Sequence, residues 1–208
     1  MPDLPPTASA ANRPLGVILM GGESRRMGAP KAAIQLAGQT LFERTVAALE
    51  PQCREIAVVV REKGQAPAGV EEIIDAEVPG AGGPLLGVLA ALRWAAGQGS
   101  LLTTPVDTPF LPADLAVRLE GAVAQNNAHS AVAMSKDRMH GLTALFAPAA
   151  LPPAEQIIVE RGERMLQAFH LQMASSPVRF STDDGDPFAN LNDPSDLAAA
   201  ENRLSSQI

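Results

Sequence analysis

The strongest constraint on the fold is an apolar run at residues 15–20 that passes directly into a segment rich in glycine and basic residues, 21–31. A continuous apolar run followed by glycine is typical of a buried parallel strand that feeds a binding loop. Glycines let backbone N–H groups point at an anion, and basic side chains then neutralise its charge. The pattern therefore predicts a phosphate-binding loop after a first strand.

The spacing within this loop differs from that of two common phosphate loops. It matches neither the G-x-x-x-x-G-K-[ST] of P-loop nucleoside triphosphatases nor the G-x-G-x-x-G of dinucleotide folds. In the P-loop the lysine follows the last glycine directly, whereas here Lys31 stands three residues after Gly28. The alternative is a glycine-rich turn with solvated basic side chains. The whole run, with its glycines, arginines and lysine together, favours phosphate binding.

Strand and helix patterns alternate from residue 15 onward. Further strands are expected at residues 56–60, 72–75, 101–104, 130–134, 142–147 and 178–180. Helices are expected from a capping box at Thr40 and Glu43 to about residue 49, from Pro84, over 112–126, in a broken region at 154–173, and after Asp193, where Pro194 takes the first helical position. This alternation predicts an α/β fold with three layers: a Rossmann-like, mostly parallel sheet with helices on both faces.

The composition fits one domain. The chain has 208 residues, enough to bury a core without disulfides, and its single cysteine, Cys53, is expected to be a buried inert thiol. Residues 1–12 are expected to form a disordered leader rather than an export signal, and residues 13–208 a single domain. Since no apolar run approaches the ~18 residues that span a bilayer, we expect a cytoplasmic protein with no membrane partner.

The net charge of −7 speaks against a nucleic-acid partner, which would require a surface of clustered positive charge. An anionic ligand must therefore be bound by a local cluster of positive side chains. Arg25, Arg26 and Lys31 supply such a focus, since a cleft can concentrate their field even on an acidic protein.

Asp107 follows the strand expected at residues 101–104 and stands between Pro105 and Pro109. In open α/β sheets, ligands lie beyond the carboxyl ends of the strands where the strand order reverses, so the glycine loop and Asp107 are expected to meet at one ligand. The prolines restrict the backbone, and a rigid carboxylate near phosphates suits Mg²⁺. The alternative is a turn in which Asp107 bonds its own backbone, and position alone favours that turn.

Four segments, taken in order, resemble the signature of the molybdenum cofactor guanylyltransferases, the MobA-type family. The first, residues 19–31, matches L-A-G-G-x-S-x-R-M-G-x-x-K except at Met20, where the family usually has Ala. The others lie at residues 83–87, 106–112 and 188–197. The resemblance covers nearly all of the chain after the first dozen residues, and it implies a fold like that of nucleotide-diphospho-sugar transferases.

The resemblance implies transfer of GMP from GTP to the phosphate of molybdopterin or its molybdenum-loaded form, with release of pyrophosphate and with Mg²⁺ as cofactor. Proteins that deliver and receive the cofactor are implied partners. Catalytic roles are implied for Lys31, Arg25 and Asp107, and the family carries its metal-binding Asp at the position of Asp107, which favours a metal ligand over a turn. The residues implied in GTP binding are Leu19, Met20, Gly21, Gly22, Ser24, Gly28, Lys31, Arg61, Asp75 and Asp107.

The base and the acceptor have their own candidate residues. Asp75 matches the family's nucleotide-contacting Asp, and a carboxylate can accept hydrogen bonds from the N1–H and exocyclic amine of guanine. Arg61 stands where the family often has an Asn, whose accepting oxygen a guanidinium lacks. The family uses asparagines such as Asn190 and Asn192 on the acceptor side, although such a pair before a helix is also typical of caps and turns. His140 lies near the acceptor-side loop and fits a structural histidine equally well.

Two other functions stay open at this point. A related transferase could use CTP or a sugar phosphate with the same phosphate machinery; the glycine pair after Met20 favours the guanine-using branch, whereas Met20 itself and Arg61 weaken that inference. A nucleotide-binding regulator without turnover is disfavoured because Lys31 and Asp107 are both present.

Overall fold

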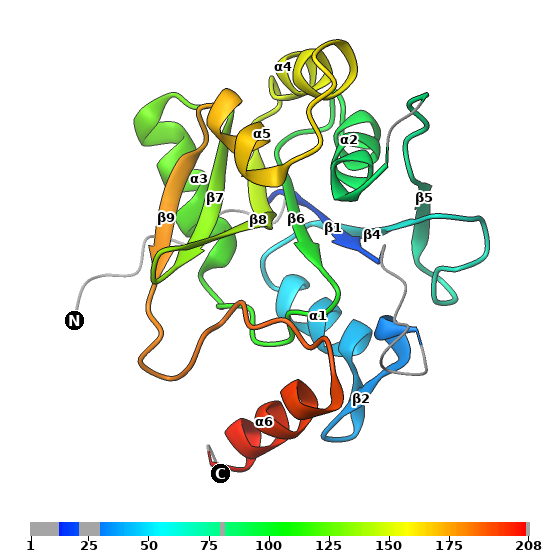
Figure 1. Cartoon of the computed structure of the whole chain (residues 1–208), viewed down its shortest axis with the longest axis vertical. Coiled ribbons are helices and arrows are strands. Elements are labelled where there is room, and N and C mark those ends of the chain that lie inside the picture. The colour runs from blue at the N-terminus through cyan, green and yellow to red at the C-terminus, as the bar shows by residue number, and fades with distance from the viewer. Residues whose placement is uncertain (1–12, 21–29, 80–81, 207–208) are drawn as a thin grey trace.

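The computed structural model describes residues 13–20, 30–79 and 82–206 of the chain. Its centre is a seven-stranded sheet with the order β5-β4-β1-β6-β8-β7-β9 (Figure 1). The strands are β1 (Leu15–Leu19), β4 (Glu55–Val60), β5 (Glu71–Ile74), β6 (Leu101–Pro105), β7 (Ser130–Ser135), β8 (Arg138–Phe146) and β9 (Ser176–Phe180). Strands β5, β4, β1 and β6 pair in parallel, as do β7 and β9, whereas β8 is antiparallel to both β6 and β7. The predicted mostly parallel sheet is confirmed.

Helices cover both faces of this sheet, as the sequence predicts. They are α1 (Leu41–Leu49), α2 (Pro84–Trp94), α3 (Leu115–Asn126), α4 (Leu151–Glu155), the π-helical turn η3 (Gln156–Glu160), α5 (Leu166–Gln172) and α6 (Pro194–Ser205). One core cluster joins α2, α4, η3 and α5 to the sheet, and a second joins α1 and α3 to its opposite face. Figure 1 shows α2, α4 and α5 on one side of the strands and α1 on the other.

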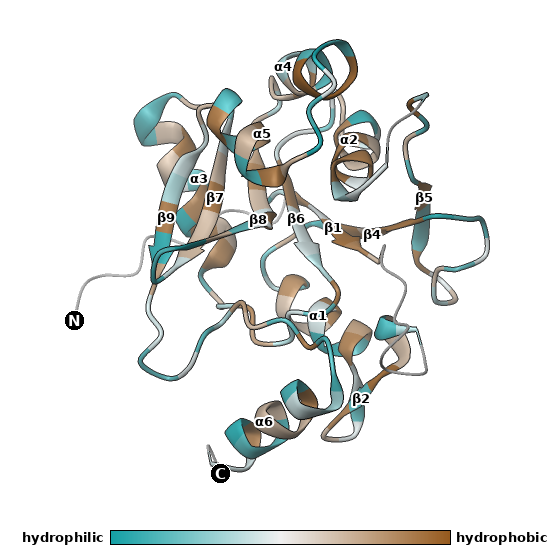
Figure 2. Cartoon of the chain, in the orientation of Figure 1, coloured by the Kyte–Doolittle hydropathy of each residue, from teal (hydrophilic) through white to brown (hydrophobic). Residues whose placement is uncertain are grey.

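Strand β1 is apolar throughout because it is covered on both faces. All five of its residues are buried, and Figure 2 shows β1 and most of β4 in the hydrophobic colour. Val17 and Leu19 belong to one core cluster, whereas Ile18 belongs to the other. The continuous run that the sequence shows is thus required by the central place of β1.

Cys53 packs closely against β1. A Cβ built on Gly16 would lie only 2.9 Å from Cys53 Sγ, so glycine is needed for this approach. Burial raises the pKa of the Cys53 thiol to about 12, which keeps it protonated at neutral pH. The expectation of a buried thiol is confirmed, and the raised pKa agrees with the expectation that it is inert.

Hydrogen bonds confirm the predicted capping box at Thr40 and the predicted cap at Asp193. Thr40 Oγ1 accepts from the backbone N of Glu43, and Glu43 Oε2 accepts in return from the backbone N of Thr40 at 2.7 Å. Asp193 caps α6 by accepting from the backbone N–H groups of Ser195 and Asp196. These caps fix the start of α1 and of α6, the helices nearest to the segment that follows the glycine-rich loop.

Three details differ from the sequence-based expectation. Helix α3 begins at Leu115 rather than residue 112, since the Leu115 N–H donates to Pro112 O in a preceding turn. Strand β8 begins at Arg138 rather than residue 142, because a tight turn with Lys136 at φ 50° joins it directly to β7. The small hairpin of β2 (Gln35–Leu36) and β3 (Gln39–Thr40) was not expected, and its strands are too short to give a periodic pattern.

Helix α6 lies apart from the sheet, beside β2 (Figure 1). Its apolar residues form a third core cluster with the hairpin, α1 and Leu191, and this cluster holds the segment before α6 near β6. Within the part of the chain that the structure describes, no helix has both the length and the apolar character needed to cross a membrane. The leader expected at residues 1–12 lies outside the described residues, and the assignment of 13–208 to one domain stays a prediction.

Candidate active site

The candidate site lies at the carboxyl ends of β1 and β6, where the strand order reverses. Strand β1 pairs with β4 on one side and with β6 on the other. The Met20 N–H donates to Val59 O at 3.0 Å, and the Val106 N–H donates to Leu19 O at 3.2 Å. These bonds lock the points at which both segments leave the sheet. This is the switch point where ligands bind in open α/β sheets.

Part of the predicted phosphate loop lies outside the described residues, namely Gly21, Gly22, Ser24, Arg25 and Gly28. The described structure resumes at Pro30, directly before the short helix η2 (Lys31–Ala33). Arg26 also lies outside the described residues. The roles of these six residues therefore stay predictions, whereas Lys31 at the end of the motif can be placed.

Lys31 joins three segments that are distant in the sequence. Its Nζ donates to Oδ2 of Asp107, a residue that follows β6. It also donates, at 2.7 Å, to Oδ1 of Asn192, a residue that precedes α6. The Leu191 N–H donates to Asp107 O at 3.0 Å, so the backbone of this segment is tied to the same point. The Lys31 and Asp107 side chains are only 18% and 9% exposed. Three of the predicted site residues thus form one contiguous polar cluster.

One oxygen of this cluster is left without a partner. Asp107 Oδ1 is buried, and no described residue donates a hydrogen bond to it. A buried acceptor of this kind costs free energy unless another group satisfies it. No group of three or more His, Cys, Asp or Glu side chains among the described residues could hold a metal by itself. Mg²⁺ needs only one or two carboxylates with phosphate oxygens and water, so Asp107 fits this ion.

Asp75 and Arg61 lie on the other side of β1, after β5 and β4. Asp75 Oδ1 accepts from the Ala76 N–H at 3.1 Å. Burial raises the pKa of the Asp75 carboxyl, an effect that the Ala76 bond and the Arg61 charge reduce. A Cβ built on Gly87 in the first turn of α2 would lie 3.6 Å from Asp75 Oδ1 and 3.4 Å from Leu19 Cδ2. The first turn of α2 therefore lies at van der Waals distance from the Asp75 carboxylate.

The sheet order fixes how these groups are arranged. Asp75 and Arg61 follow β5 and β4, Leu19 ends β1, and Asp107 follows β6, so the groups form a row across the carboxyl ends of neighbouring strands. A ligand that touches both Asp75 and Asp107 must cross the end of β1. The glycine-rich segment begins at that end, which suits a nucleotide whose base and phosphates lie in this order.

A pocket of about 150 Å³ lies beyond Asp107 in the same row, between the end of β6 and the start of β8. Asn190, the second predicted acceptor residue, lines it together with Thr108 and His140. His140 Nε2 shares a hydrogen bond with Ser135 Oγ at 2.6 Å, and its ring lies 4.8 Å from that of Phe188. His140 is therefore a partnered, largely buried residue at the pocket wall.

The chain resembles known proteins over most of its length. Residues 16–175 match the family model described as the MobA-like NTP transferase domain. The chain is 42% identical to the molybdenum cofactor guanylyltransferase of Sinorhizobium fredii over 94% of each chain. It is 40% identical to the enzyme of the same name from Rhodobacter capsulatus, over 91% of this chain and 95% of that protein.

Solved structures share the fold. The molybdopterin-guanine dinucleotide biosynthesis protein A of Archaeoglobus fulgidus superposes with a TM-score of 0.71 at 24% identity, covering 93% of this chain and 100% of that one. The 2-C-methyl-D-erythritol 4-phosphate cytidylyltransferase of Thermus thermophilus gives a TM-score of 0.64 at 20% identity, covering 92% and 98%. Both likenesses support the three-layer architecture.

Proposed function

The chain belongs to the MobA-like NTP transferase family, and we propose that it transfers GMP from GTP to the terminal phosphate of molybdopterin or of its molybdenum-loaded form. The products are the guanine dinucleotide form of the cofactor and pyrophosphate. The observation that carries this proposal is the contact of Lys31 with both Asp107 and Asn192 at the switch point of the sheet. The names of the most similar relatives support the choice of substrates.

In the proposed reaction, an oxygen of the acceptor phosphate forms a bond to the α-phosphorus of GTP. The bond from that phosphorus to the oxygen bridging to the β-phosphate breaks, and pyrophosphate leaves with the electron pair. The acceptor is a phosphate monoester whose second pKa is about 6, so it is largely dianionic at neutral pH and needs no protein base. Positioning and charge stabilisation then supply the catalysis.

Each part of the row has a proposed task in this reaction. Lys31 and Arg25, with the backbone of the glycine loop including Gly21, Gly22, Ser24 and Gly28, bind the β- and γ-phosphates. Leu19 and Met20 bring the chain to the end of β1, and Asp75 with Arg61 faces the base. Asn190 and Asn192 face the acceptor.

Asp107 is proposed to hold Mg²⁺ through the buried oxygen that has no partner among the described residues. When bound, this ion would neutralise charge on the phosphate oxygens, as hard cations do at phosphoryl-transfer sites. In the described structure, Lys31 already neutralises the other oxygen of the same carboxylate. The carboxylate can thus place two positive charges on one side of the phosphates.

Incubation with molybdopterin, Mg²⁺ and each of the four nucleoside triphosphates in turn tests the proposal. We expect a guanine dinucleotide by mass spectrometry, together with stoichiometric pyrophosphate, and no product with CTP, ATP or UTP. A cytosine dinucleotide would assign the chain to a related cytidylyltransferase. Nucleotide binding without any pyrophosphate would make it a regulator. A cytoplasmic location and the proteins that deliver and receive the cofactor stay predictions.

The choice of base is expected to depend on Asp75. In Asp75→Asn, the amide can no longer accept two hydrogen bonds from guanine, since one of its oxygens is replaced by a donor. Hydrogen bonds to a charged group contribute about 1.5–3 kcal/mol, so the preference for GTP over ATP should fall by about 10- to 100-fold. Competition binding measures this ratio. Asp137→Asn, whose side chain is fully exposed, is the matched control. An unchanged ratio in folded Asp75→Asn would remove Asp75 from the base site.

A further inference from the structure

The pocket between β6 and β8 has no role in the phosphate chemistry proposed above. It lies on the far side of Asp107 from Asp75, because β6 and β8 stand between β1 and the β7–β9 edge of the sheet. Pro105 and Thr108 on its wall flank Asp107 in the sequence, and Asn190 is two residues from the Lys31 ligand Asn192. A molecule in this pocket is therefore adjacent to the lysine and carboxylate cluster.

An irregularity in β8 creates the pocket. Strand β8 pairs with β6 only through residues 144–146, and its earlier part leaves β6 to follow β7. The register against β7 shifts at this point: Val132 pairs with Ala144, whereas the next residue, Ala133, pairs with His140. Residues 141–143 bulge out between these pairs. The end of β6 is thus left with an open space beside it rather than a neighbouring strand.

Two buried side chains hold this bulge in place. His170 Nε2 lies 2.8 Å from Gly141 O and donates to it, because a carbonyl only accepts, while its Nδ1 lies 2.8 Å from Ser175 Oγ. Thr103 Oγ1 donates to Leu142 O at 2.9 Å. A Cβ on Gly141 would lie only 3.0 Å from Leu166 Cβ, so the wall is closely packed. The pocket is therefore built before any ligand arrives, which lowers the entropic cost of binding.

The walls of the pocket carry both apolar and polar side chains, a combination that suits a flat heterocycle. Leu142 and Leu166 offer apolar surface, whereas Arg138, Asn190 and Thr143 carry donors and acceptors. Thr143 is 1% exposed, and its hydroxyl has no partner among the described residues. A ring with apolar faces and hydrogen-bonding edges would satisfy both kinds of surface. A cavity of about 150 Å³ accommodates one aromatic ring such as benzene. This pocket has that volume and is open on one side, so a fused ring system can extend out of it.

We infer that this pocket binds the fused heterocyclic ring of the acceptor, with the Thr143 hydroxyl bonded to the edge of the ring and Leu142 and Leu166 against its faces. This inference rests on the proposed function. The acceptor's phosphate then reaches the Lys31 and Asp107 cluster, while guanine lies at the opposite end of the row beside Asp75. The two ring systems of the product are thus held on opposite sides of the phosphates that become joined.

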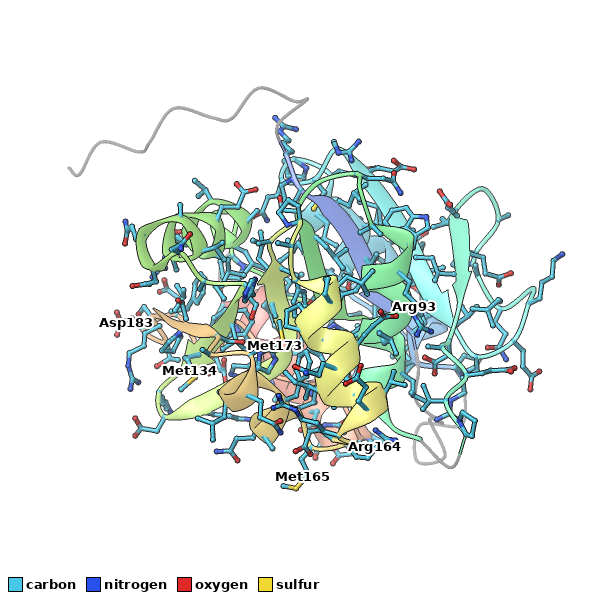
Figure 3. All side chains as sticks on the ribbon, turned by 90° about the horizontal axis from the view of Figure 1, so that it is seen from above. Arg93, Met134, Arg164, Met165, Met173 and Asp183 are labelled. Carbon is cyan, nitrogen blue, oxygen red and sulfur yellow. The ribbon has the colours of Figure 1, made fainter. Side chains whose placement is uncertain are left out.

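Thr143→Val and Thr143→Ser form the matched pair that tests this inference. Valine keeps the shape of threonine but removes the hydroxyl, whereas serine keeps the hydroxyl and loses a methyl group. Because the Thr143 hydroxyl has no described partner in the ligand-free protein, we expect Thr143→Val to melt at the parent temperature or above it. His129→Gln is the control, since His129 is exposed on the loop before β7. Met165→Ala is a second control, because Met165 is next to Leu166 but points away from the molecule (Figure 3).

The first readout is direct binding of an unphosphorylated pterin, followed by its own fluorescence or by saturation-transfer NMR. We expect Thr143→Val to weaken this binding about three- to tenfold, while Thr143→Ser and both controls bind as the parent does. The second readout is steady-state kinetics, in which Thr143→Val raises KM for molybdopterin by a similar factor and leaves KM for GTP unchanged.

Equal pterin binding by the parent and Thr143→Val would overturn the inference. So would a raised KM for GTP in Thr143→Val, because the pocket would then belong to the nucleotide base. Pterin binding that depends on the Thr143 hydroxyl, in a protein that forms no dinucleotide, supports the pocket assignment and contradicts the proposed transferase reaction. The two hypotheses therefore fail in different experiments.

Discussion

Asp107→Asn is expected to reduce turnover by about 10²–10³-fold, which is typical for the loss of one preorganised electrostatic partner. Asparagine nearly keeps the shape of aspartate but removes the charge that a hard cation needs. The remaining rate should no longer depend on Mg²⁺. Pyrophosphate release measured over a range of Mg²⁺ concentrations gives both quantities.

The same substitution has a second expected result, which distinguishes a catalytic from a structural Asp107. In the described structure, Asp107 holds the Lys31 ammonium. Without the carboxylate charge, this ammonium is free to meet the triphosphate, so GTP binding in the absence of Mg²⁺ should be unchanged or tighter. Calorimetry in the presence of a chelator measures it.

Asp184→Asn, an exposed aspartate in the loop after β9, is the matched control and should keep the parent rate. If well-folded Asp107→Asn releases pyrophosphate at the parent rate with the parent Mg²⁺ requirement, the metal assignment is wrong. Asp107 is then a turn residue that positions Lys31.

The local chemistry of the strand ends could be predicted from the sequence because each signal is contained within a few residues. Three such signals are the apolar run of β1, the Thr40 capping box with the Asp193 cap, and the proline at the start of α2. Each acts on its own neighbours, and the structure has all of them. The alternation of these elements was sufficient to predict the three-layer sheet, because parallel strands need helical crossovers.

The pocket beside β6 could not be predicted in the same way. It depends on a register shift between β7 and β8, and the residues that stabilise the shift, Thr103 and His170, come from distant elements. Nothing in the sequence around Thr143 or Arg138 distinguishes them from ordinary strand residues. The proximity of Gly87 to Asp75 is equally non-local, since it requires α2 to pack over the end of β5.

The contact between Lys31 and Asn192 is an intermediate case. Each residue was singled out by the sequence, Lys31 for the phosphates and Asn192 for the acceptor, but they are separated by 161 positions. Their direct hydrogen bond arises because α6 packs on the hairpin that follows Lys31. The bond places the proposed acceptor side and the proposed phosphate side within reach of one ammonium group.

Lys31→Ala is expected to weaken GTP binding and to slow turnover together, with a combined loss of about 10²–10³-fold in kcat/KM. A cation that meets the triphosphate in the ground state also stabilises the charge on the leaving pyrophosphate. Lys31→Arg should recover part of the binding, since it keeps the charge but not the compact ammonium geometry. Lys63→Ala, which removes an exposed lysine, is the control. Parent kinetics in folded Lys31→Ala would restrict Lys31 to a structural role.

The double variant Lys31→Ala/Asp107→Asn separates the structural and the chemical contributions of the pair. Lys31→Ala leaves the Asp107 carboxylate, whose side chain is 9% exposed, without its cation, so the melting temperature should fall. In the double variant the uncompensated charge is gone, so most of this stability should return. GTP binding should stay as weak as in Lys31→Ala, because the cation that meets the phosphates is still missing. A pair that serves only the fold would recover binding together with stability, since each residue would then matter only through the other.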